Sequence, residues 1–80
     1  MNYLAEFTDT FSGELNYSWV RRASFYAPDN ASTSLLIRRA KKALGIHGRH
    51  AILWDTPEGI TARMVGECTA FTITPKGGDV

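Results

Sequence analysis

The chain has 80 residues, of which 44% are hydrophobic and 21% are charged, a composition typical of one globular domain. Its apolar runs are far shorter than the roughly 20 residues that span a bilayer, and its first residues lack the features of a signal peptide. The single cysteine, Cys68, excludes an intrachain disulfide. We therefore expect a cytoplasmic protein that does not associate with membranes.

The net charge of +1 conceals an uneven distribution along the chain. Residues 1–18 carry three acidic side chains and no basic one, whereas residues 19–50 carry seven basic side chains against Asp29 alone. Residues 51–80 are again mildly acidic. Such an asymmetry says more about binding partners than the total charge does.

Two strands are expected before the helix. Tyr3–Phe7 alternates between apolar and polar residues, and Tyr17–Tyr26 is dense in aromatic and β-branched types. Between them, Thr8–Glu14 is rich in turn formers and reads as a loop or wide hairpin. Arg21 and Arg22 would place one charge on each face of the second strand, which predicts a bulge near the pair or an edge position.

The clearest helix lies within Asn30–Gly45. Asn30 and Ser32 are both suitable N-cap residues, and Gly45 can adopt the left-handed conformation after the last turn. Helical periodicity gathers an apolar face, formed by Thr33, Leu36, Ile37, Ala40, Ala43 and Leu44.

The second half of the chain predicts three more strands. They lie at His50–Asp55, Ile60–Val65 and Cys68–Thr74, with a tight turn at 56–59 and a flexible tail at 75–80. Simple alternation puts Ile52 and Trp54 on the same face. The order β-β-α-β-β-β predicts a single α+β domain, with an antiparallel sheet of about five strands and one helix packed on one face.

No catalytic motif is visible, and we expect neither a cofactor nor a metal site. His47 and His50 are too few to bind a metal without further ligands. They could serve as an acid–base pair for RNA cleavage, but we favour the simpler interpretation that they belong to a polar connector between helix and strand.

The helix also carries a basic stripe, in which an apolar residue interrupts the cations. Its members are Leu35, Arg38, Arg39 and Lys42. Leu35 could be an apolar anchor on a protein-binding face whose cations pair with carboxylates. Alternatively, Arg21 and Arg22 could join the helix cations in one phosphate-binding patch, or the stripe could simply be solvated.

The aromatic residues allow two interpretations. If exposed on the sheet, they could stack on bases, as in proteins that bind single-stranded nucleic acids. In so small a domain we expect Trp19 and Trp54 in the core, and Tyr17 and Tyr26 at the surface.

The stretches Met1–Phe11 and Asn16–Phe25 resemble a group of small prophage and mobile-element proteins, some of which are type I (I-C) anti-CRISPR proteins. The resemblance implies a non-enzymatic viral protein that acts in the host bacterial cytoplasm. Such a protein binds the CRISPR surveillance complex (Cascade) through protein–protein interaction and blocks recognition of target DNA.

Because Cascade presents basic DNA-binding grooves, the resemblance favours an acidic binding region. That region would consist of Glu6, Asp9, Phe11, Glu14 and Tyr17. The alternative function is a nucleic-acid-binding phage accessory protein that uses the basic helix face, with Arg21, Arg22, Leu35, Arg38, Arg39 and Lys42. A free sheet edge would be compatible with a monomer or a weak homodimer.

Overall fold

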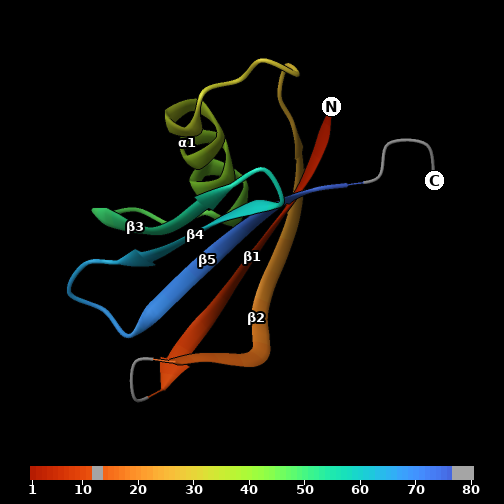
Figure 1. Cartoon of the computed structure of the whole chain (residues 1–80). Coiled ribbons are helices and arrows are strands. Elements are labelled where there is room, and N and C mark those ends of the chain that lie inside the picture. Colours follow the sequence, from red (N-terminus) through yellow and green to blue (C-terminus); the bar gives the residue numbers. More distant parts are fainter. Residues whose placement is uncertain (12–13, 77–80) are drawn as a thin grey trace.

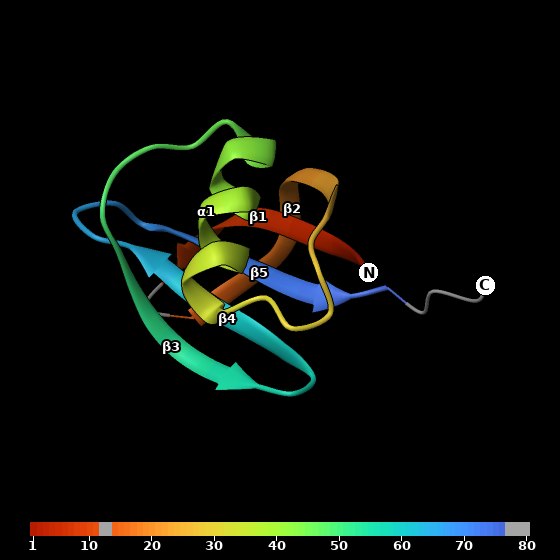
Figure 2. The ribbon, with the colours of Figure 1, turned by 90° about the horizontal axis from the view of Figure 1, so that it is seen from above.

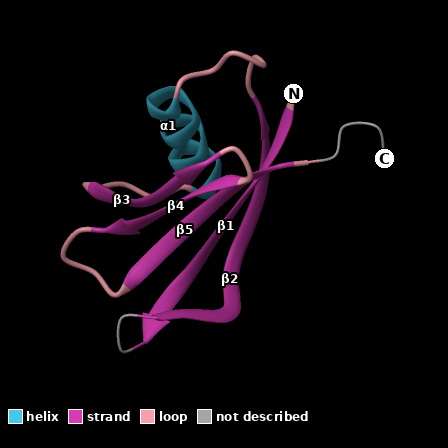
Figure 3. Ribbon diagram, viewed as in Figure 1, coloured by secondary structure: helices cyan, strands magenta, loops and turns pink. Residues whose placement is uncertain are grey.

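The computed structural model describes the backbone of residues 1–11 and 14–76, and the side chains of residues 1–8 and 21–76. It contains one helix and five strands (Figure 1, Figure 3). Their bounds are β1 Asn2–Phe11, β2 Glu14–Tyr26, α1 Thr33–Leu44, β3 His50–Thr56, β4 Gly59–Met64 and β5 Thr69–Pro75. The predicted α+β fold, with its β-β-α-β-β-β order, is confirmed.

The strands form one antiparallel sheet in the order β2-β1-β5-β4-β3, so that β2 and β3 are the two edges. Helix α1 lies on one face of this sheet and contacts mainly β2, β1 and β5. In Figure 2, β3 lies to one side of α1, on the side away from β2. The helix therefore covers only part of the sheet, and β3 lies beyond the part that it covers.

Both ends of α1 are closed by local hydrogen bonds. Ser32, rather than Asn30, is the N-cap, and its hydroxyl oxygen accepts from the amide of Leu35 at 3.2 Å. Gly45 follows the helix with a φ of 72°, as the sequence predicts. The backbone amide of Gly45 donates to the carbonyl of Lys42, and that of Ile46 donates to the carbonyl of Lys41, which is the Schellman arrangement.

The core lies between α1 and the sheet. Ile37, Ala40 and Leu44 supply the buried stripe of the helix. The strands contribute buried side chains at every second residue, among them Tyr3, Ala5, Ile60, Ala62, Met64, Phe71 and Ile73. Ala43, which periodicity assigned to the apolar face, is exposed instead. Leu36 is only partly buried against this core, so the buried stripe is narrower than predicted.

The first hairpin is longer than the sequence suggested. The loop predicted for 8–14 is wrong over residues 8–11 and at Glu14, because β1 continues to Phe11 and β2 begins at Glu14. Pairing with both β2 and β5 supports this extension, which outweighs the turn propensity of the residues. The predicted irregularity near Arg21 is present: Phe7 pairs with Arg21, whereas Thr8 pairs with Trp19.

A second irregularity reverses a prediction in β3. Ile52 pairs with Ala62 but Trp54 pairs with Thr61, so one residue of β3 is left over at the shift. Because Ala62 and Thr61 point to opposite faces of β4, Ile52 and Trp54 also face opposite sides. Trp54 is 60% exposed, so its expected place in the core is wrong. The side chain of Trp19 lies outside the described residues.

The C-terminal segment departs from the predicted tail at its beginning. Pro75 is the last residue of β5, and the amide of Lys76 donates to the carbonyl of Asn2 at 2.9 Å. The rest of the expected tail, residues 77–80, lies outside the described residues. Within the described chain, the one helix is too short and too polar to cross a bilayer.

Candidate functional site

The outward side of α1 is strongly basic. Its cations are Arg38, Arg39, Lys41 and Lys42, and the helix contains no acidic residue. Arg39 donates to the carbonyl of Tyr26 at 2.7 Å. Arg38 and Lys42 make no side-chain hydrogen bond or ion pair with the described residues. Both are exposed, so their charges remain available to a partner.

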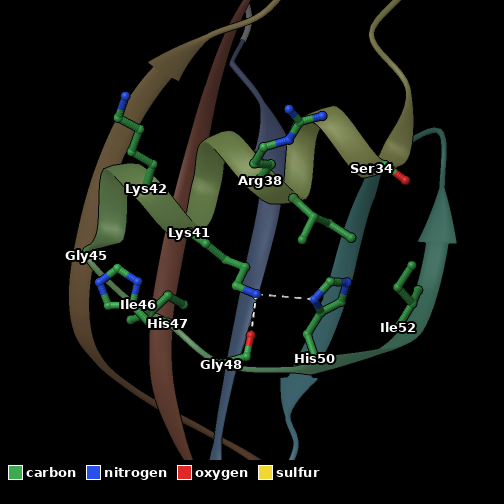
Figure 4. Close-up of a pocket in the computed structure, with 11 residues that line it drawn as sticks. Ser34, Arg38, Lys41, Lys42, Gly45, Ile46, His47, Gly48, His50 and Ile52 are labelled. Carbon is green, nitrogen blue, oxygen red and sulfur yellow. Dashed lines mark hydrogen bonds between the residues drawn. The ribbon is translucent and has the colours of Figure 1, made fainter.

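A groove of about 590 Å³ separates α1 from β3 and the connector between them (Figure 4). We call it the α1–β3 groove. Isoleucines contribute the apolar part of its lining, and the polar side chains of the lining are those of arginine, lysine, histidine and one serine. The groove is lined by Ser34, Ile37, Arg38, Lys41, Lys42, Gly45, Ile46, His47, Gly48, His50 and Ile52. An apolar groove without an acidic side chain suits an anionic ligand that also has apolar groups.

A second groove, of about 490 Å³, flanks the helix on its β2 side. It is lined by Phe25, Leu35, Arg38, Arg39, Lys42 and Ala43. This set contains the whole predicted stripe of Leu35 and its three cations, so the structure brings those four residues together. Leu35 is half-buried and not fully exposed. Arg38 and Lys42 line both grooves and form the ridge between them.

Lys41 bridges the α1–β3 groove (Figure 4). Its ammonium group donates to the carbonyl of Gly48 and lies 3.5 Å from Nδ1 of His50. Burial, and secondarily the charge of Lys41, lower the pKa of His50. At neutral pH His50 is therefore an uncharged acceptor for Lys41, with its ring edge-on to Phe71 at 6.3 Å between centroids.

This geometry gives the two histidines different surroundings. His47 is exposed on the connector, whereas His50 is half-buried beside Lys41. No group of three or more His, Cys, Asp or Glu side chains within the described part of the chain could hold a metal ion. The contacts of His50 with Phe71 and Lys41 pack its ring and position the lysine.

Arg21 and Arg22 lie on opposite faces of the sheet. The Arg21 guanidinium donates to the carbonyl of Leu44 at the C-terminal end of the helix. Arg22 lies on the opposite face of the sheet and pairs with Glu6 at 2.6 Å. Arg22 therefore cannot join the helix cations in the single patch predicted from both arginines, because neighbouring strand residues point to opposite faces.

The proposed acidic region is only partly described. Glu6 is 17% exposed and its carboxylate is paired with Arg22, so its charge is already compensated. The side chains of Asp9, Phe11, Glu14 and Tyr17 lie outside the described residues. Tyr26 is 62% exposed, as predicted, but it lies on the sheet face that α1 does not cover.

The edge strand β3 contributes groove residues that sequence reasoning missed. Ile52, Leu53 and Trp54 are all more than 40% exposed. Ile52 lines the α1–β3 groove together with His50, and Lys41 reaches it from the helix. Three consecutive large apolar residues were the available signal, but alternation suggested that the side chains on one face of the strand would be buried.

No family model, curated protein or solved structure matches this chain.

Proposed function

We propose that this protein acts without catalysis, by binding an acidic surface of a partner protein through the basic face of α1. The observation that carries the proposal is that α1 has an apolar groove on each side and, between the grooves, cations that form no hydrogen bond or ion pair with the described residues. Arg38 and Lys42 stand between the two grooves, so a single partner could contact both. Apolar anchors surrounded by charge are typical of protein-binding surfaces.

The partner we propose is a protein subunit of a type I CRISPR surveillance complex, as the resemblance of the opening residues implies. Binding would inhibit recognition of target DNA. The basic face of α1 supports an acidic protein surface as the docking site, rather than the DNA-binding groove. Inhibition would then follow from steric obstruction or from holding the complex in an unproductive state.

The test is a pull-down of the tagged protein with a purified type I-C surveillance complex, in the presence and absence of target DNA. Arg38→Glu should reduce retention of the complex, because Arg38 lines both grooves. The fold should persist, since Arg38 makes no side-chain hydrogen bond or ion pair with the described residues. Arg63→Glu is the matched control: it makes the same charge change on an exposed side chain of the opposite sheet face.

Retention that Arg38→Glu abolishes and Arg63→Glu preserves would support the proposal. Equal loss in both variants, or no retention of the complex, would refute it. The alternative is nucleic-acid binding by the same helix. It predicts affinity for duplex DNA that falls steeply with salt, with a log–log slope of roughly one per phosphate neutralised. A shift of duplex DNA without retention of the complex would favour that alternative.

A further inference from the structure

The two edges of the sheet are protected very differently. β2 carries Arg21 and Arg22 as well as irregular pairing with β1, and these features discourage the addition of another strand. β3 contains no lysine and no proline. Instead it exposes Ile52, Leu53 and Trp54, by 43–60%. An exposed apolar edge is uncommon in natural sheets unless something pairs with it.

The alternation of hydrogen bonds between β3 and β4 identifies which backbone groups of β3 are free to pair with another strand. The carbonyl of Arg49 accepts from the amide of Val65, so Arg49 belongs to a hydrogen-bonded pair with the β4 side. Because such pairs alternate in an antiparallel ladder, the N–H and C=O of His50 and Ile52 point away from β4. Within the described chain, no other element pairs with them. The shift after Ile52 limits the regular part of this edge to a few residues.

The free edge and the α1–β3 groove adjoin each other. His50 and Ile52 belong to both: their backbones face the open edge, and their side chains line the groove (Figure 4). A strand added to β3 would direct every second side chain toward the groove. There those side chains would meet the apolar Ile37 and Ile46 and the cationic Arg38 and Lys41.

We infer that β3 accepts an extended peptide segment of a partner protein as a sixth, antiparallel strand, with alternate side chains in the α1–β3 groove. The inference rests on the proposed function and specifies its mode of binding. Main-chain hydrogen bonds would supply part of the affinity, and the groove would supply the selectivity. An antiparallel orientation matches the rest of the sheet.

Charge determines the kind of segment that fits. The groove is cationic around His50 and Lys41, whereas Asp55 and Glu58 lie at and beyond the other end of β3. An antiparallel segment presents its C-terminal part to His50 and its N-terminal part to Asp55. The segment should therefore be acidic toward its C-terminus, apolar at the alternate positions before it, and free of acid at its N-terminus.

The probe is the acetylated and amidated peptide Lys-Thr-Val-Thr-Val-Thr-Glu, titrated into the full chain while backbone amide NMR signals are followed. The peptide of reversed sequence is the matched control, because it keeps composition and alternation but exchanges the charged ends. We expect saturable shifts at His50 and Ile52 and along the groove face of α1. The reversed peptide should bind at least fivefold more weakly.

N-methylation tests the strand pairing separately from charge. Methylating the second valine removes the N–H that would face Ile52 and should weaken binding on the order of fivefold, the value of one hydrogen bond. Methylating the last threonine removes an outward N–H and is the control. Arg38→Glu should weaken binding, and Arg63→Glu should leave it unchanged.

Several outcomes would overturn the inference. Shifts confined to α1, or equal effects of the two methylations, would show that β3 is not paired, while the proposed acidic contact with α1 would survive. The absence of saturable binding at millimolar peptide would also overturn it. Shifts of β3 amides that depend on protein concentration without peptide would identify a second copy of the chain as the occupant. The pull-down with the surveillance complex tests the proposed function independently of all these results.

Discussion

Replacing Arg21 by methionine tests whether this arginine stabilises the helix from outside it. The last carbonyls of a helix have no partner within the helix, and the Arg21 guanidinium donates to one of them, that of Leu44. Its positive charge also lies at the negative end of the helix dipole. Methionine keeps much of the aliphatic length of arginine but removes both interactions.

The magnitude follows from these two contributions. A hydrogen bond to a charged group contributes about 1.5–3 kcal/mol, and the exposure of Arg21 places it at the lower limit. A cation at a helix end contributes roughly 0.3–1 kcal/mol. We therefore expect Arg21→Met to lower the free energy of unfolding by about 2 kcal/mol. In a domain of this size, that corresponds to a decrease in Tm of roughly 8–16 °C.

The assay is urea denaturation of the intact chain, followed by tryptophan fluorescence and by circular dichroism. Arg63→Met is the control, because Arg63 is exposed and its side chain makes no hydrogen bond or ion pair with the described residues; its effect should stay within about 0.5 kcal/mol. Equal denaturation midpoints for the two variants would refute the reasoning. The Arg21→Met variant should still bind its partner at urea concentrations below the denaturation midpoint of the variant, because Arg21 lines neither groove.

Three further predictions concern the fold and the groove. Ser32→Ala should cost about 1 kcal/mol in urea denaturation through loss of the N-cap, and Ser32→Asp should retain most of the stability. Gly59→Ala should cost about 1–3 kcal/mol in the same assay, because the new Cβ would lie 2.9 Å from the carbonyl oxygen of Ile73; an unchanged midpoint would contradict this contact. The pKa of His50 is lowered in the folded protein, so His50 is protonated at a higher pH in the unfolded chain than in the folded one. Stability should therefore be complete above about pH 6.5 and decline as the pH falls below it. His50→Gln should remove the decline that begins below about pH 6.5, and urea midpoints that fall in parallel for both proteins as the pH is lowered would contradict this prediction.

The sequence by itself predicted the position of α1 and the order of the elements. Helix caps and a 3.6-residue period are local properties, so the sequence could predict Gly45 after the helix, limit the N-cap to Asn30 or Ser32, and include the buried Ile37, Ala40 and Leu44 in a wider apolar face. The same local reasoning placed Arg21 and Arg22 on opposite faces of a strand. It also assembled Leu35 with Arg38, Arg39 and Lys42, which line one groove in the structure.

Only the tertiary structure decided which strands are neighbours and where the helix rests. β3 is an edge because it pairs with β4 alone, and a groove lies beside it because α1 packs on β2, β1 and β5. One irregularity in its pairing with β4 turned Trp54 outward. Alternation along a strand states which residues share a face, but the strand register and the partner strands arise from hydrogen bonds between distant segments. A single shift in that register exchanges the faces of all following residues, and no local pattern in β3 encodes it.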